Sequence, residues 1–197
     1  MLRDAIRRIP VWLVWVLGLL PLVWLVVQAF RGGLGVDPVK ALEHRLGLHG
    51  LQFLLLGLAI TPLRRLGLNL LRFRRAIGLI AFTYVMLHFA VWLSLDMQFE
   101  WNQIGRDLVR RPYILIGMAG LLLLIPLALT SNDASLRRLG ARRWRLLHRL
   151  TYVAVLAGAL HFVLLVKGWP AEPFLYLGAA AALLLLRLLW VSRRASV

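Results

Sequence analysis

The chain has 197 residues, of which 61% are hydrophobic, and a formal net charge of +16. Soluble domains are closer to half apolar, so the composition indicates that most of the chain lies within a lipid bilayer. No cysteine is present, which excludes disulfides, iron–sulfur clusters, cysteine-ligated zinc and c-type heme attachment.

Six apolar segments approach the length of about 20 residues that a helix needs to cross the hydrocarbon core. Proline or glycine marks many of their ends, as is usual at helix boundaries. The first segment is too long for the apolar part of a signal peptide, so we interpret it as a span. The sequence therefore predicts one all-α integral membrane domain over residues 1–197, a bundle of six transmembrane helices. Its predicted spans are residues 11–30, 46–63, 76–95, 112–130, 150–166 and 173–189.

The basic residues are distributed unevenly along the chain. With six spans, both termini share one side with 17 of the 24 Lys and Arg residues and two acids, against seven basic residues and six acids on the other. Cytoplasmic loops are enriched in Lys and Arg, so we predict that both termini are cytoplasmic in a bacterial inner membrane. The excess charge then reflects topology and contact with anionic lipid headgroups, not nucleic-acid binding.

Two histidines are predicted at matching depth in the membrane. His88 lies roughly 18 Å into the third span, and His161 lies roughly 20 Å into the fifth span, which runs in the same direction. Ionisable side chains in spans are usually functional, and imidazole is a common ligand of heme iron. The pair predicts a heme held between two facing helices, with His88 and His161 as axial ligands. The alternative is that each histidine only hydrogen-bonds a neighbouring helix.

His148, near the cytoplasmic end of the fifth span, is a candidate ligand of a second heme. The residues at its depth on the third span are Arg74 and Arg75, so no second histidine pair is predicted. The 13 residues from His148 to His161 also turn the side chain by about 140° on an ideal helix, so the two need not face one groove. Three roles stay open for His148: a second heme with another ligand, contact with a heme propionate, or none.

Two further histidines, His44 and His49, lie at the outer end of the second span. His49 is just inside the apolar run and is placed to approach the heme predicted between His88 and His161. Histidines at a membrane interface are common, so both are secondary candidates.

The sequence contains no Gly-x-Gly-x-x-Gly unit, no P-loop and no room for a cytosolic nucleotide-binding domain. The chain is therefore not expected to take hydride from a nicotinamide cofactor, and no substrate-converting site of its own is evident. We expect an electron-transfer subunit that receives electrons from membrane quinol or from a soluble reductase.

Several motifs together resemble one known family. They are Gly32–Lys40 followed by His44, Ile60–Leu63, Arg74–Leu79 followed by His88, Arg111–Tyr113, and Trp144 with His148, Arg149, Tyr152 and His161. Along nearly its whole length the chain is similar to MsrQ (YedZ), the heme-binding membrane subunits of periplasmic protein-methionine-sulfoxide reductase systems. These belong to the ferric-reductase-like transmembrane superfamily.

The resemblance implies a six-helix inner-membrane protein that binds heme b and FMN and takes electrons from quinol or a cytosolic flavin reductase. It implies as acceptor an MsrP-like periplasmic molybdoenzyme, which repairs oxidised methionine in periplasmic proteins. His88, His148 and His161 match the heme-associated histidines of the family. Larger superfamily members have two histidines on each of two helices, whereas this chain has arginine at 74 and 75.

Two alternatives to this interpretation remain. A quinone-linked cytochrome b or a metal reductase with another acceptor would have the same sequence features. A non-redox membrane protein would use its histidines only to bridge helices, but a transporter would be expected to show interrupted polar helices or an inverted repeat. The sequence has neither, and the outer segments 31–45 and 96–111 are the predicted docking surface for an acceptor.

Overall fold

The computed structural model describes Ile6 and residues 8–195, and within these residues the chain is helical with no strand. The elements are α2 (Val11–Phe30), α3 (Pro38–Arg65), η1 (Leu71–Phe73), α4 (Arg74–Val91), η2 (Trp92–Asp96), α5 (Trp101–Arg110), α6 (Pro112–Leu129), α7 (Asp133–Leu147), α8 (Leu150–Leu165) and α9 (Ala171–Ala195). The predicted all-α class is confirmed.

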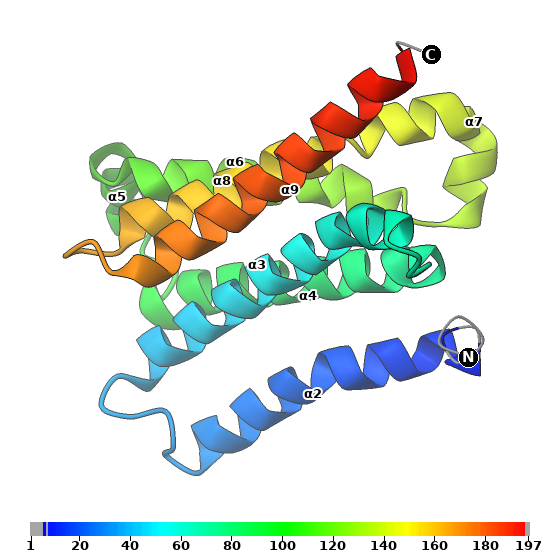
Figure 1. The fold of residues 1–197 in the computed structure, drawn as a ribbon. Helices are drawn as coiled ribbons and strands as arrows, with labels where there is room; N and C mark the ends of the chain where they lie inside the picture. Colours follow the sequence, from blue (N-terminus) through cyan, green and yellow to red (C-terminus); the bar gives the residue numbers. More distant parts are fainter. Residues whose placement is uncertain (1–5, 7, 196–197) are drawn as a thin grey trace.

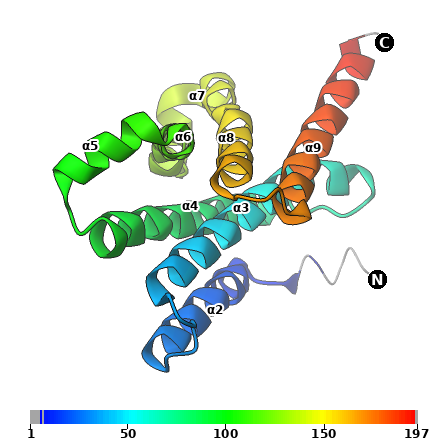
Figure 2. The same cartoon turned by 90° about the vertical axis from the view of Figure 1, so that its left-hand side faces the viewer.

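The helices pair along their lengths. Helix α3 packs along α4 and α6 packs along α8, while α9 lies over α3 and α8 and α2 lies on the outside of α4 (Figures 1 and 2). The short helix α5 lies at one end of the bundle, and α7 lies at the other, the end at which α2 starts and α9 finishes (Figure 1). We call these the α5 end and the α7 end.

The core forms where α3, α4, α6, α8 and α9 meet. Leu54, Leu58, Ala81, Val155 and Ala180 are among its buried members. Many large apolar side chains on the outside of the bundle are exposed instead, and α2 is an example with exposed Leu17, Leu20 and Trp24. Exposed apolar faces of this extent are expected where lipid, not water, surrounds a helix.

Four helical segments are long and apolar enough to cross a membrane: Val11–Phe30, Pro38–Arg65, Leu71–Asp96 and Pro112–Leu129. A fifth is obtained if α7 and α8, which are bent by 42° relative to each other, count as one broken span. Helix α7 has no buried residue and several exposed arginines, so we place it outside the membrane and treat α8 as the apolar part. Six spans and the cytoplasmic position of the termini remain predictions.

The second span begins earlier than predicted, at Pro38 rather than residue 46. The Asp37 carboxylate accepts a hydrogen bond from the Lys40 backbone N–H at 3.0 Å, and proline occupies the first helical position. Both features stabilise a helix start, so the polar residues before the apolar run extend α3 by two turns. The connecting segments that form α5 and α7 were expected as loops, and the structure shows them as helices.

A long basic side chain near the end of an apolar helix commonly extends toward the membrane interface, whereas Arg187 on α9 points into the bundle and is only 8% exposed. Pro62 has no N–H, so the carbonyl of Leu58 one turn earlier lacks its normal helical partner. Arg187 Nη2 donates to that carbonyl at 2.6 Å, and Nη1 donates to the Tyr152 hydroxyl at 2.9 Å. Arg187 thus joins α9 to α3 and α8.

Candidate functional site

His88 on α4 and His161 on α8 face each other across the bundle. Their ring centroids are 6.2 Å apart, and the ring planes are inclined by 78°. Both rings line a cavity between α3, α4, α6 and α8 that contains about 1130 Å³ of empty space, its opening included.

The two imidazoles have matching backbone partners. His88 Nδ1 is 2.8 Å from the carbonyl oxygen of Glu43 on α3, and His161 Nδ1 is 2.7 Å from that of Tyr113 on α6. A carbonyl only accepts, so each Nδ1 carries the proton and donates. This assigns the lone pair to Nε2 in both rings, the arrangement in which a histidine can ligate a metal through Nε2 while its other nitrogen is held in place.

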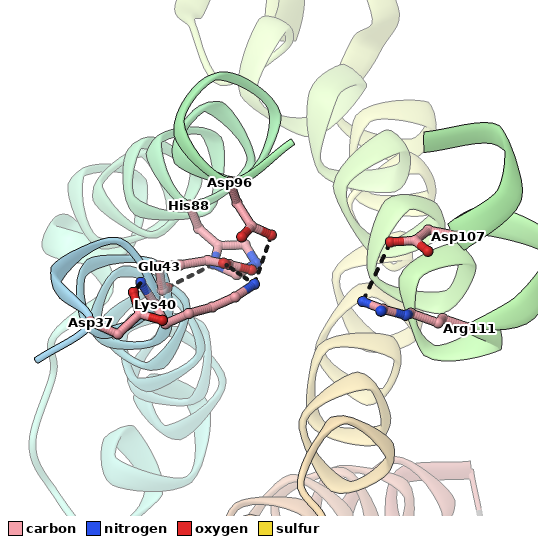
Figure 3. A network of polar contacts seen from close by, with 7 residues as sticks. All are labelled: Asp37, Lys40, Glu43, His88, Asp96, Asp107 and Arg111. Atoms are coloured by element: carbon pink, nitrogen blue, oxygen red, sulfur yellow. Dashed lines mark hydrogen bonds and ion pairs between the residues drawn. The ribbon is translucent and has the colours of Figure 1, made fainter. Parts of the chain in front are cut away.

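The cavity is polar at the α5 end and apolar further in. Lys40, Glu43, Asp96 and Arg111 line its polar end, and Figure 3 shows them in two groups on opposite sides. Lys40 Nζ lies 2.7 Å from Asp96 and 3.3 Å from Glu43, and Arg111 lies 3.4 Å from Asp107. The deeper lining is apolar and includes Leu51, Leu54, Val85, Leu121 and Leu165. The polar end therefore presents two cations and two carboxylates, and each cation is already paired with an acidic side chain.

These four polar residues were not identified as site residues from the sequence. Lys40, Glu43 and Asp96 were assigned to outer loops, whereas α3 and η2 extend far enough to bring them beside His88. The available signal was the clustering of charges at the outer ends of the second and third spans.

Of the two secondary candidates, His44 and not His49 lies in the cavity lining, whereas the sequence suggested that His49 would approach the heme. His44 lines the cavity and its ring centroid lies 5.5 Å from that of Phe162. His49 is absent from the lining, and its Nδ1 lies 3.0 Å from the Gln52 side-chain oxygen. The His49 ring instead faces Tyr84 of α4, and the centroids of these two rings are 5.5 Å apart.

His148 lies away from the cavity, at the junction of α7 and α8. Its ring stacks on Trp144 with centroids 3.7 Å apart, and its Nε2 is 3.2 Å from Thr130 Oγ1. The Thr130 hydroxyl donates its proton to the Pro126 carbonyl at 2.7 Å, so Oγ1 accepts from His148 Nε2–H. Partial burial, with a smaller contribution from the nearby Arg74 guanidinium, lowers the pKa of His148 to about 4. The structure therefore brings together His88 and His161 but not His148.

The donor set restricts the kind of metal that fits. No group of three or more His, Cys, Asp or Glu side chains in the described residues is arranged to hold a bare ion. Two imidazoles satisfy a metal only when other ligands come with it, as in a porphyrin. Imidazole nitrogen lies roughly 2 Å from a bound metal and the ring centre roughly 1 Å further, so two axial imidazoles have centroids roughly 6 Å apart. The observed 6.2 Å agrees with that spacing.

Comparison with known proteins identifies relatives along most of the chain. The ferric reductase like transmembrane component family matches residues 45–159. A protein-methionine-sulfoxide reductase heme-binding subunit MsrQ from Brucella anthropi is 53% identical over 179 residues, 90% of this chain and 81% of that protein. The proteins of the same name from Brucella ovis and Brucella suis are each 52% identical over 178 residues, 90% of this chain and 80% of theirs. The chain therefore belongs to the MsrQ family of ferric-reductase-like transmembrane proteins.

Proposed function

We propose that this chain binds heme b between His88 and His161 and carries electrons across the membrane to a periplasmic methionine sulfoxide reductase. The observation that carries the proposal is the facing histidine pair, with each Nδ1 hydrogen-bonded to a backbone carbonyl and centroids 6.2 Å apart. The relatives are named as heme-binding subunits of such reductases, which supports the same conclusion.

The residues of the cavity have separable tasks. Heme iron supplies reversible one-electron transfer. His88 and His161 would hold the heme through their Nε2 atoms. The carbonyls of Glu43 and Tyr113 hold the ring orientations. The deeper lining is apolar, and Lys40 and Arg111, each paired with an acidic side chain, are the cations at the α5 end.

The partners belong to the proposal as well. Family resemblance favours an MsrP-like molybdoenzyme as acceptor, quinol or a cytosolic flavin reductase as donor, FMN as a second cofactor, and the bacterial inner membrane as location. The polar end of the cavity adjoins α5, and we expect this end to face the periplasm because the opposite end carries most of the arginines. The outer segments 31–45 and 96–111 would then form the docking surface.

A second candidate function rests on the family match. A ferric-reductase-like membrane component with the same histidine pair would also serve a metal reductase or a quinone-linked cytochrome b. The two functions differ in the acceptor and not in the electron-carrying site.

The deciding experiment is a reduced-minus-oxidised visible spectrum of detergent-purified protein, with heme counted per chain. We expect a b-type spectrum, and reoxidation of the dithionite-reduced heme by an MsrP-like enzyme with methionine sulfoxide. Reoxidation by ferric chelates alone would favour the metal reductase. A colourless protein expressed with ample heme would contradict the proposal and leave the histidines as helix bridges.

A further inference from the structure

Each of the two facing histidines lies against a glycine of the neighbouring helix. A Cβ on Gly47 of α3 would lie 3.0 Å from His88 Nδ1 and 3.2 Å from its Cε1. A Cβ on Gly117 of α6 would lie 2.8 Å from His161 Nδ1 and 3.0 Å from its Cε1. Both separations are shorter than normal contacts of a methyl group, so neither ring could keep its position beside alanine.

Gly47 and Gly117 stand at the same sequence spacing from the residues whose carbonyls accept the histidine hydrogen bonds. Gly47 follows Glu43 by four residues on α3, and Gly117 follows Tyr113 by four residues on α6. The Cα–Cβ bonds of a helix tilt toward its N-terminus, so a side chain covers the turn before its own Cα. A side chain at 47 or 117 would cover the carbonyl that accepts the histidine Nδ1–H. Glycine leaves this carbonyl open to a second hydrogen bond, and its oxygen has two lone pairs.

A second glycine, three residues further on, completes a Gly-x-x-Gly pattern on both helices. Gly50 packs against Val85 on α4, and a Cβ there would lie 2.8 Å from Val85 Cγ2. Gly120 packs against Ala157 on α8, with a corresponding distance of 3.4 Å. Small residues of this kind let membrane helices approach closely. These two contacts bring α3 to α4 and α6 to α8 without touching a histidine.

We infer that Gly47 and Gly117 are positioning residues that seat the two axial histidines. Each glycine permits the Nδ1–H to carbonyl bond that fixes ring orientation and leaves Nε2 available for iron. The inference rests on the proposed heme function and deepens it, because it names residues that control heme affinity and potential without contacting the iron. The paired placement distinguishes them from glycines that serve helix packing alone.

The test compares Gly47→Ala and Gly117→Ala with alanine variants elsewhere on the same interfaces. Gly50→Ala is the matched control for Gly47, because its Cβ crowds the same helix pair at least as closely but meets Val85. Gly120→Ala on α6 and Gly57→Ala on α3 are mild controls, because their Cβ atoms would make ordinary contacts of 3.4 Å with Ala157 and 3.8 Å with Ile77. The measurements are heme per folded chain, the low-spin ferric EPR signal, and the heme midpoint potential.

Loss of a partner that orients a metal ligand usually lowers metal affinity by about 10- to 100-fold. We expect heme affinity to fall by that order in Gly47→Ala and Gly117→Ala, with an altered EPR signal and a shifted potential in the heme that remains. Gly50→Ala should lower thermal stability but keep the wild-type signal and potential, and Gly120→Ala should keep all three near wild type.

Two results would overturn the inference. One is a wild-type spectrum, heme content and potential in both Gly47→Ala and Gly117→Ala. The other is an equal loss of folded protein in Gly47→Ala and Gly50→Ala with unchanged spectra in what remains, which would assign the glycines to packing. Wild-type protein that purifies without heme would instead refute the proposed function.

Discussion

His161 lies on α8 and His148 lies just before its first residue, yet their ring nitrogens are used in opposite ways. His161 donates from Nδ1 to the Tyr113 carbonyl and faces the cavity with the lone pair on Nε2. His148 donates from Nε2 to Thr130 Oγ1 and stacks on Trp144. The nitrogen that is free for iron in one ring is engaged in the other.

The comparison indicates that the partners of the ring nitrogens distinguish these two histidines. A histidine becomes a candidate when a neighbouring backbone carbonyl takes Nδ1–H and a glycine lets the ring approach that carbonyl. At the α7 end, polar side chains close to His148 satisfy it instead. Its ring and Trp144, which itself donates to the Thr130 carbonyl at 2.8 Å, connect α7 to the end of α6.

The largest effect is expected at the facing pair. His88→Ala and His161→Ala each remove one axial ligand, and we expect heme per chain to fall by more than about tenfold. His44→Ala is the control, because His44 lines the same cavity but has no matching carbonyl contact in the described structure. Pyridine hemochrome quantification of purified protein measures the outcome. Normal heme content in either variant would show that the pair is not the ligand set.

Composition and hydropathy predicted the helical membrane fold, because a long apolar helix is the main way to satisfy the backbone in lipid. They also predicted that His88 and His161 meet, since parallel spans convert residue spacing into depth. Helix α3 begins about two turns before the predicted span, because local capping at Asp37, not hydropathy, decides where that helix begins.

Other features depended on contacts between distant helices. The role of Arg187 required knowing that the Leu58 carbonyl of α3 faces it, which sequence position alone does not show. The place of Gly47 beside His88 depended on the register between α3 and α4. The recognisable signal was the Gly-x-x-Gly spacing present in both α3 and α6, four residues after the residue that supplies the carbonyl.

The α7 end should depend for stability on Arg187. Arg187→Met keeps the apolar stem but leaves the Leu58 carbonyl and the Tyr152 hydroxyl unpaired, which costs about 1–3 kcal/mol. We expect a lower Tm in detergent with an unchanged heme spectrum, because the α5 end is untouched. The exposed Arg142→Met is the control.

A double variant sharpens this prediction. Pro62→Ala restores an N–H that can bond the Leu58 carbonyl, so the loss caused by Arg187→Met should be smaller in that background. If Arg187→Met lowered stability equally in the two backgrounds, Arg187 would not be replacing the hydrogen bond to the Leu58 carbonyl that Pro62 cannot make.

His148→Ala tests the contrast between the two histidines directly. It removes a stacked aromatic contact and one hydrogen bond, together about 1–2 kcal/mol of stability. The heme of the facing pair should remain, with its spectrum intact. Complete loss of heme would contradict the separation of the two ends, and loss of half would assign His148 to a second heme.

The smallest expected effect is a pH dependence that arises at the α7 end. The pKa of His148 is lowered from 6.5 to about 4, first by burial and second by Arg74, so the folded state holds this ring neutral. Its contribution to stability is complete above pH 6.5 and is lost as pH falls toward 4, because the unfolded chain takes up the proton first. The ring is only half-buried, so solvent screening keeps the effect modest. The Tm of the wild-type protein should therefore fall more between pH 7 and pH 5 than that of His148→Gln, measured in the same detergent. Parallel Tm curves would show that the neutral His148 contact does not contribute to stability in this range.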